Sequence, residues 1–398
     1  MIAQSRVTTA RMDIDVIDIA RPAPLLGGLA PRDFMQRHWQ KTPLVVRAAV
    51  PHAARIASRA QVLSLAARDG VESRLVVREG ERWSLRHGPL PRRALPPVKT
   101  PGWTVLVQGA DLHLEAAHAL LACFRFVPDA RLDDLMLSWA SDGGGVGPHV
   151  DSYDVFLLQV RGRRRWRVAP PKRSARLRDD VPLKMLAHFA PRHEWLLEEG
   201  DMLYLPPGWG HDGVAEGETI TASIGFRAAG PRALAVEVLQ QLVDAVEPDP
   251  DEMRYADPAQ PATARPARIP AALSRYAADA VAQLLREDDA RVRALGAALS
   301  EPKPGTWFEP GAARVRGVGV RLDRRTRMLY DARYVYINGE AYRAAGRDAV
   351  LVRRLADRRA LDAAEFAALG RGARALMDEW LAAGWLQPAP SGDDAADR

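Results

Sequence analysis

His149 and Asp151, an imidazole and a carboxylate two residues apart, could together bind a metal ion. They follow a glycine-rich segment and stand at the start of a strand pattern. Because successive side chains of a strand point to opposite faces, residues i and i+2 project to the same side. A chain with nine histidines contains such a pair by chance, so a second element is needed before a metal site is inferred.

That second element is the stretch of residues 200–211, GDMLYLPPGWGH, which reads as a strand, a tight Pro-Gly turn and a final histidine, His211. Its spacing is glycine, five residues, proline, one residue, glycine, two residues and histidine, and it resembles the second cupin motif. The first cupin motif is partly present, because five residues separate Gly143 from His149. Cupin barrels carry such histidines on neighbouring strands, so we expect His149, Asp151 and His211 to meet.

Two imidazoles and one carboxylate leave about three positions open on a six-coordinate metal, which suits non-haem Fe(II). Bidentate 2-oxoglutarate would take two of these positions and dioxygen the third. Val155 stands near the place where cupins with four ligands have a glutamate. A structural zinc site would require further cysteines or histidines, and Cys123 is the only cysteine. We therefore expect Fe(II) at the three catalytic residues, with 2-oxoglutarate and O2 as cosubstrates.

The distal carboxylate of 2-oxoglutarate needs a fixed cation, and an arginine offers a bidentate fork. Arg164 is our candidate, and strand alternation turns it to the opposite face from Arg163 and Arg165. Alternatively, all three arginines are solvated. Ser138 and Thr221, on neighbouring strands, could donate hydrogen bonds to the same carboxylate. Alternatively, their hydroxyl groups form hydrogen bonds only within the protein.

Short strands dominate the region around these residues, and helical patterns lie at its flanks. The expected strands cover residues 135–139, 155–160, 165–168, 202–205 and 220–226, with a turn at 161–163. No parallel strand-helix-strand repeat is present. The fold class is therefore α+β, with a barrel or two-sheet jelly roll.

Beyond Gly230-Pro231 the pattern becomes helical, and Val236, Leu239 and Val243 form one apolar stripe. This stripe either joins two protomers or packs within its own chain. A proline-rich connector and further helices follow, and after residue 303 short strands and helices form a third part. We expect an oxygenase domain over 1–228, a helical dimerisation or linker region over 229–303 and a C-terminal domain over 304–398.

Composition excludes disorder, collagen and a disulfide scaffold, since 47% of the 398 residues are hydrophobic and only one is a cysteine. Only five of the 56 basic residues are lysines, and the net charge is +6. Codon bias explains this arginine excess better than a polyanionic partner does. No stretch of about 18 apolar residues is free of charge, so we expect no membrane segment. A cytoplasmic protein is indicated.

Four stretches occur in the order found in JmjC-type 2-oxoglutarate oxygenases, and more narrowly in bacterial ribosomal oxygenases of the ycfD (RoxA) type, which the chain resembles. They are LLGGLAPRDFMQRHWQKTPLVVR, LSWASDGGGVGPHVDSYDVFLLQVRGRRRWRV, EEGDMLYLPPGWGHDGVA and SIGFRA. The resemblance implies a double-stranded β-helix, a helical dimerisation region and a C-terminal winged helix. It also implies iron on His149, Asp151 and His211, and 2-oxoglutarate on Arg164 and Ser138. The implied activity is β-carbon hydroxylation of an arginine in a large-subunit ribosomal protein.

An arginine substrate would favour carboxylates or an aromatic face at the barrel mouth, and Asp142, Tyr153 and Asp154 lie beside the metal motif. Turn chemistry for Asp142 and edge packing for Tyr153 are the structural alternatives. Arginine and histidine hydroxylases share the iron motif, and demethylation of an N-methyl group uses the same chemistry. A rival function is a ligand-sensing protein that binds nucleic acid through residues 353–359, although direct nucleic-acid binding is not expected.

Overall fold

The computed structural model describes residues 18–172, 176–247, 250–311, 314–315 and 317–389. The chain divides into two compact units, with a boundary between Ala228 and Ala229. The first unit comprises the described residues up to Ala228 with Pro304–Glu309 and Asp323–Arg325, and the second comprises the remainder. The predicted division of the second part at residue 303 stays a prediction.

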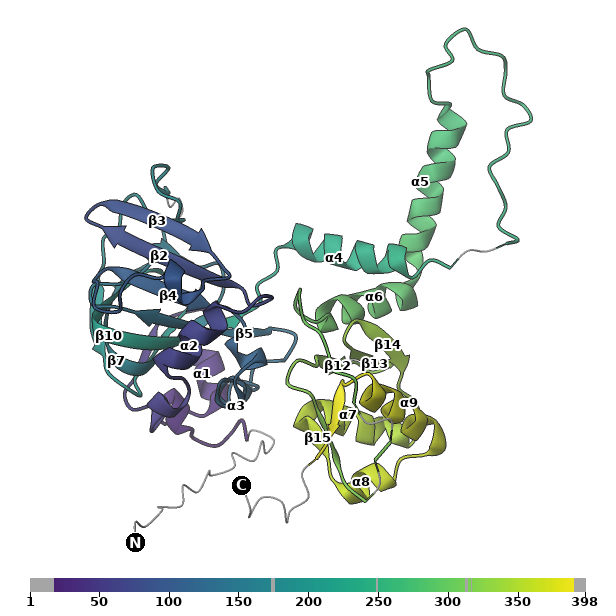
Figure 1. Cartoon of the computed structure of the whole chain (residues 1–398). Helices are drawn as coiled ribbons and strands as arrows, with labels where there is room; N and C mark the ends of the chain where they lie inside the picture. Colours follow the sequence, from purple (N-terminus) through teal and green to yellow (C-terminus); the bar gives the residue numbers. More distant parts are fainter. Residues whose placement is uncertain (1–17, 173–175, 248–249, 312–313, 316, 390–398) are drawn as a thin grey trace. The chain divides into compact units, whose positions relative to one another are not determined.

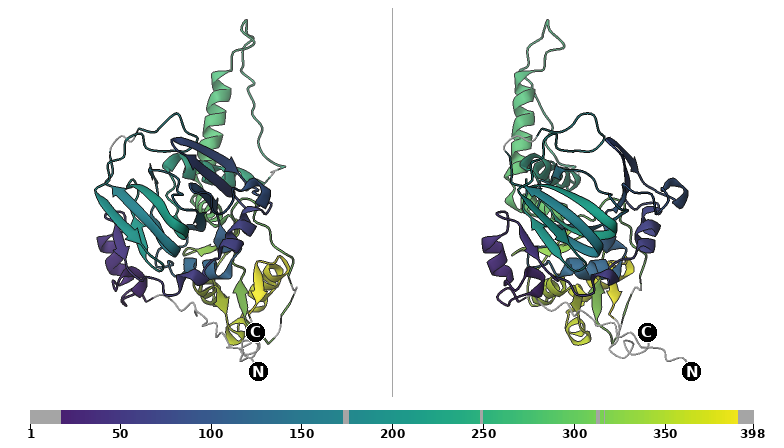
Figure 2. Two further views of the ribbon diagram at one scale, coloured as in Figure 1. Left: turned by 60° about the vertical axis from the view of Figure 1, so that its left-hand side comes forward. Right: turned by 90° about the vertical axis from the view of Figure 1, so that its left-hand side faces the viewer.

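The first unit is built around one antiparallel sheet of ten strands. They are β1 (Leu44–Val46), β2 (Ser73–Glu79), β3 (Arg82–His87), β4 (Trp103–Val107), β5 (Leu132–Ala140), β6 (His149–Val150), β7 (Val155–Ala169), β8 (His193–Leu197), β9 (Met202–Leu205) and β10 (Gly210–Phe226). The order is β1-β9-β7-β10-β5-β4-β2-β3, with β6 on β10 and β8 on β7. β7 and β10 lie side by side in Figures 1 and 2. The antiparallel β architecture expected from the sequence is confirmed.

The prediction of a turn at residues 161–163 is wrong, because β7 continues through these residues as one strand. Gly162 has φ +71, and a Cβ there would lie 2.2 Å from the Glu218 carbonyl oxygen. The pairing of β7 with β10 shifts register between Glu216 and Ile220. The glycine therefore permits an irregularity within a long strand where the sequence suggested a reversal. One half of β7 pairs with β9 and the other with β8.

Among the described residues, the first unit also contains four short 3-10 helices and three α-helices: α1 (Pro31–Arg37), α2 (Arg59–Ala66) and α3 (Glu115–Ala122). Pro31 occupies the first turn of α1, where its missing N–H costs nothing, and Phe34 is fully buried against Phe156 and Tyr204. Burying such a ring stabilises the fold by about 1.5–3 kcal/mol. A reciprocal capping box between Ser58 and Gln61 begins α2. These helices hold the sheet that carries the site.

Asp201, before β9, fastens the segment after β1 to the β8–β9 turn. Its carboxylate accepts from the backbone N–H groups of Ala48 (2.9 Å) and Glu198 (3.1 Å) and from Nη1 of Arg47 (2.6 Å). Burial by itself would raise the pKa of Asp201, but the donated hydrogen bonds and the Arg47 charge outweigh burial and lower it. The ionised carboxylate is thus the form that stabilises the fold.

Asp201→Asn is expected to lower the free energy of unfolding by about 2–3 kcal/mol at neutral pH, because charged hydrogen bonds are lost. A lowered folded-state pKa gives stability that is present above the unfolded-state pKa and is lost as pH falls through the folded-state value. The difference between wild type and variant should therefore shrink below about pH 4. Urea unfolding at neutral and acid pH measures this, and Glu199→Gln, at an exposed neighbour, is the control. An equal difference at both pH values would contradict the assignment.

The second unit contains six helices and six short strands within the described residues. The helices are α4 (Pro231–Asp244), α5 (Ala271–Arg286), α6 (Asp288–Ser300), α7 (Asp348–Arg358), α8 (Ala363–Ala367) and α9 (Arg371–Ala382). The strands are β11 (Val320–Leu322), β12 (Met328–Tyr330), β13 (Tyr334–Ile337), β14 (Glu340–Arg343), β15 (Ala360–Leu361) and β16 (Leu386–Pro388). They form two three-stranded sheets, β15-β11-β16 and β12-β13-β14. Leu355, Phe366, Trp380 and Leu381 lie in their common core.

The two long helices of this unit differ from the rest in how little they bury. α4 buries only Leu242 and packs against α6, and α5 has no buried residue.

Within the described part of the chain, no helix is both long and apolar enough to span a membrane.

Candidate metal centre

His149 and His211 come together because their strands pair directly. His149 lies opposite His211 in the β6–β10 register, so both side chains project from the same face. The glycine-rich segment before β6 approaches β10 closely, since a Cβ on Gly145 would lie 2.6 Å from the Gly213 carbonyl oxygen. The turn before β10 requires φ +79 at Gly208, a conformation that glycine adopts without strain.

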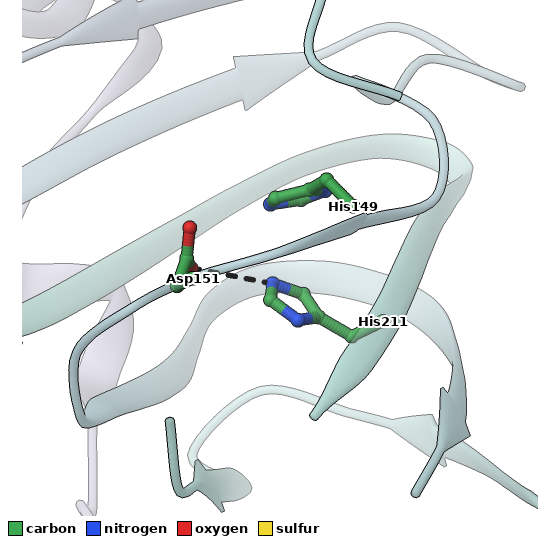
Figure 3. A group of neighbouring side chains, drawn as sticks. All are labelled: His149, Asp151 and His211. Carbon is green, nitrogen blue, oxygen red and sulfur yellow. Dashed lines mark ion pairs between the residues drawn. The ribbon is translucent and has the colours of Figure 1, made fainter. Parts of the chain in front are cut away.

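The expected pair of His149 and Asp151 and the more distant His211 form one cluster (Figure 3). One ligand atom from each lies within 4.8 Å of the other two. His211 Nε2 is 3.6 Å from Asp151 Oδ2, and the two imidazole centroids are 4.2 Å apart. Two nitrogens and one oxygen can therefore converge on a single ion. Their role as ligands stays a prediction.

Backbone carbonyl groups orient both imidazoles so that Nε2, and not Nδ1, is left for a metal. Nδ1 of His149 lies 2.9 Å from the Gly147 carbonyl oxygen, and Nδ1 of His211 lies 3.1 Å from that of Trp209. A carbonyl only accepts, so each Nδ1 carries a proton, and in the neutral form of either ring Nε2 keeps the lone pair that binds a metal. Burial and the neighbouring His149 lower the pKa of His211 to about 4, against the opposing effect of Asp151. The ring is neutral at pH 7, as metal binding requires.

Arg164 lies inside the barrel as the strand alternation predicts, and it is 5% exposed. Its Nη1 donates to Ser138 Oγ at 3.4 Å, while Nε and Nη2 are buried and have no hydrogen-bond partner among the described residues. Burial lowers the pKa of Arg164 to about 10, partly offset by Asp212, so the guanidinium is still charged at neutral pH. A buried cation with two unused donors fits a bound carboxylate.

Two hydroxyl groups lie near Arg164, and the two arginines next to it in sequence point away from the barrel interior. Thr221 lies opposite Ser138 on β10, and its hydroxyl donates to Gln159 Oε1 at 3.2 Å. Ser138 in turn donates weakly to the Thr221 carbonyl oxygen at 3.5 Å. Arg163 and Arg165 point outward, where Arg165 pairs with Glu194 and Glu216. Of the three consecutive arginines, only Arg164 is placed to hold an internal anion.

The three substrate candidates have different surroundings. Tyr153 is 38% exposed, and burial, together with Asp151 and Asp134, raises the pKa of its hydroxyl, which keeps it protonated. Asp142 is exposed and accepts from the Gly217 N–H at 2.8 Å, which is the turn role. Asp154 is fully buried and accepts from Tyr204 Oη at 2.6 Å and Gln40 Nε2 at 3.1 Å. The burial of Asp154 indicates a structural role, and the substrate roles of Asp142 and Tyr153 stay predictions.

Trp166 is a site neighbour that the sequence reasoning missed. Its ring centroid is 5.9 Å from that of His211, and the Arg164 guanidinium lies 5.6 Å from it. Its Nε1 is also buried without a partner among the described residues. The signal was present, because Trp166 follows Arg164 by two positions and so shares its face. Gly213, opposite Trp166, leaves room for the ring, since a Cβ there would lie 2.6 Å from it.

Comparison with known families places two domains on the chain. A JmjC domain matches residues 119–234, and a ROXA-like winged helix matches residues 274–387. The chain is 37% identical over 238 residues to a ribosomal protein uL16 3-hydroxylase of Escherichia coli K12, covering 60% of this chain and 62% of that protein. It is 33% identical over 209 residues to a probable ribosomal oxygenase of Haemophilus influenzae, covering 50% of each. The aligned part thus spans less than two thirds of either relative.

A solved structure of YcfD, a ribosomal oxygenase from Escherichia coli in complex with cobalt and 2-oxoglutarate, resembles the chain over most of its length. The TM-score is 0.73 at 29% sequence identity, and the match covers 91% of this chain and 99% of that one. The resemblance to JmjC oxygenases and the expected winged helix are therefore confirmed.

Proposed function

The chain combines a JmjC domain with a ROXA-like winged helix, and from this premise we propose that it is an Fe(II)- and 2-oxoglutarate-dependent protein hydroxylase. One observation carries the proposal: the cluster of His149, Asp151 and His211 occurs in the same barrel as Arg164, a buried cation with unused donors. A simple metal site would not require that cation. An oxygenase that uses an anionic cosubstrate would.

Different residues of the site would bind the metal and the cosubstrate. His149, Asp151 and His211 would hold the ion, and Arg164 with Ser138 would hold the distal carboxylate. When bound, iron and 2-oxoglutarate activate dioxygen, and the cosubstrate is converted to succinate and CO2. Arg164 would fix the orientation of the cosubstrate through a charged contact from its unused donors. The apolar barrel wall, which includes Leu157 and Leu203, limits access of water.

We propose an arginine of a large-subunit ribosomal protein as the substrate, hydroxylated at its β-carbon. The Escherichia coli relative is named for ribosomal protein uL16, which supports uL16 as the target. In this chain the half-exposed Tyr153, whose hydroxyl lies near Asp151, offers an aromatic face next to the metal cluster. A planar guanidinium stacks well on such a face.

The direct test is conversion of 2-oxoglutarate to succinate, followed by NMR, with the Fe(II)-loaded protein and a uL16 fragment. We expect turnover that depends on the fragment and disappears in His211→Ala. Salt-dependent DNA binding without any turnover would support the rival, in which the barrel only senses a ligand.

We also propose that α4 and α5 join two copies of the chain. Val236, Leu239 and Val243 on α4 are 66%, 44% and 60% exposed, so the apolar stripe is not covered within its own chain. α5 likewise exposes Tyr276 and Val281. A second copy presenting the same stripe would bury both. The single cysteine and the ribosomal substrate support a cytoplasmic location.

A triple replacement of Val236, Leu239 and Val243 by glutamate is expected to convert the dimer into a monomer, because charges would be buried at the interface. Light scattering at micromolar concentration measures the mass of wild type and variant. Arg232→Glu on the same helix is the charge control. A wild-type chain that is monomeric under these conditions would contradict the proposal.

A further inference from the structure

One short segment of the chain combines many basic residues with few acidic ones. Residues 74–99 hold seven basic and two acidic residues and so carry a net charge of +5. Residues 161–178 are more basic still, with nine basic and no acidic residues, but Arg165, Arg167 and Arg178 of that stretch form ion pairs. What distinguishes residues 74–99 is how their cations are partnered.

This segment forms the β2–β3 hairpin and the chain that follows it. β3 is the last strand in the sheet order and lies outermost in Figure 1, beyond β2 and β4. Six of its seven cations are exposed: Arg78, Arg82, Arg86, Arg92, Arg93 and Lys99. We name these six residues the hairpin cations. Along the sheet β3 is four strands from β10, which carries His211, or about 19 Å at the usual strand spacing, so the hairpin is separate from the metal centre.

The hairpin cations lack carboxylate partners. Within the described residues none of the six forms an ion pair, and Arg78, Arg86 and Arg92 donate hydrogen bonds to backbone carbonyl oxygens. Some arginines elsewhere are paired: on α7 of the winged-helix region, Arg354 and Arg358 both contact Glu365. Unpaired exposed cations at one edge indicate an anionic partner that supplies the missing charges.

The hairpin also offers a groove and an aromatic ring. A groove of about 630 Å³ is lined by Arg82, Arg86, Ser84 and Glu79, together with apolar side chains of β2 and residues 94–96. On the other face of the hairpin, the half-buried Trp83 carries the Arg78 guanidinium 5.5 Å from its ring centroid. Arginine matches phosphate geometry, and an aromatic ring can stack on a base, whereas an acidic peptide needs no ring.

We propose that the β2–β3 hairpin is a binding surface for the phosphate backbone of an RNA. This proposal goes beyond the proposed hydroxylase function, because RNA binding at the hairpin needs no metal. The choice of RNA over other nucleic acids rests on the proposed ribosomal substrate, whereas the charge argument does not.

The test measures anisotropy of a fluorescein-labelled single-stranded RNA of mixed sequence with the full chain at several salt concentrations. About six phosphate contacts predict a slope of log affinity against log salt near −4. The triple variant Arg78→Gln, Arg82→Gln, Arg93→Gln is expected to flatten the slope by about 2 and to weaken binding about 100-fold at ~0.1 M salt. Trp83→Leu should weaken it about tenfold and leave the slope unchanged.

The matched control is Arg21→Gln, Arg37→Gln, Arg55→Gln, which removes the same charge from exposed positions in the same unit. Equal losses in both triple variants, or no loss in the hairpin variant, would overturn the proposal. A labelled poly-glutamate that binds as tightly as the RNA would overturn it in favour of an acidic protein. Succinate formation is measured in parallel: RNA binding without turnover would refute only the proposed function, and turnover without RNA binding only the hairpin surface.

Discussion

Asp151→Ala is expected to abolish turnover and to weaken metal binding by at least about 100-fold, because a ligand matters at least as much as the partners that orient ligands. The variant keeps both imidazoles, which their backbone carbonyl partners still orient. It loses the one anionic donor of the cluster. Two neutral ligands retain a divalent ion poorly, so the expected defect lies in metal affinity and not in the fold.

Titration with Co(II), followed by its visible absorption, separates the two explanations. The Asp151 side chain is 21% exposed, so its removal leaves no deep cavity and the unfolding midpoint should stay close to that of wild type. Asp69→Ala, at an exposed position in the same unit, is the control for a lost carboxylate. A variant that bound Co(II) normally and kept full activity would remove Asp151 from the metal centre.

Arg164→Met is expected to have opposite effects on cosubstrate binding and on stability. Truncation of the buried charged contact should weaken 2-oxoglutarate binding by about 100-fold. The free protein, in contrast, should be as stable as wild type or more stable by about 1 kcal/mol, because Nε and Nη2 of Arg164 are buried without partners. Methionine fills similar space and needs no hydrogen bond.

Thermal unfolding with and without 2-oxoglutarate measures both effects in one experiment. In wild type the cosubstrate should raise the midpoint temperature of unfolding, as any ligand that binds only the folded state does. In Arg164→Met this rise should be nearly absent. Arg163→Met, whose side chain is 57% exposed, should behave like wild type. A destabilised variant with normal 2-oxoglutarate binding would show that Arg164 is merely structural.

Strand alternation was the part of the sequence that predicted the site best. It placed His149 and Asp151 on one face and separated Arg164 from Arg163 and Arg165, and the structure has both features. The same rule failed to give the length of β7, because the glycine within it looked like a turn. A positive φ fits a bulge as well as a reversal, and only the pairing with β10 decides between them.

Other features depend on contacts that the sequence does not contain. Asp154 follows Tyr153 directly, yet it is buried by Tyr204 and Gln40, which lie far away along the chain. The charges are a similar case. Arg354 and Arg358 on α7 and the arginines on the β2–β3 hairpin read alike in sequence. Only the fold shows that the first two contact Glu365, whereas the hairpin cations form no ion pair within the described residues. Local patterns predict faces of strands, whereas partners are set by the tertiary structure.

Mass spectrometry of ribosomal proteins from the same organism tests the central proposal most directly. The protein is loaded with Fe(II) without oxygen and then incubated with uL16, 2-oxoglutarate and air. We expect a gain of one oxygen, about +16 Da, which fragmentation places on the β-carbon of one arginine, and no gain with Asp151→Ala. Consumption of 2-oxoglutarate with unmodified arginine in uL16, or with oxygen on a histidine or loss of an N-methyl group, would contradict the proposed substrate.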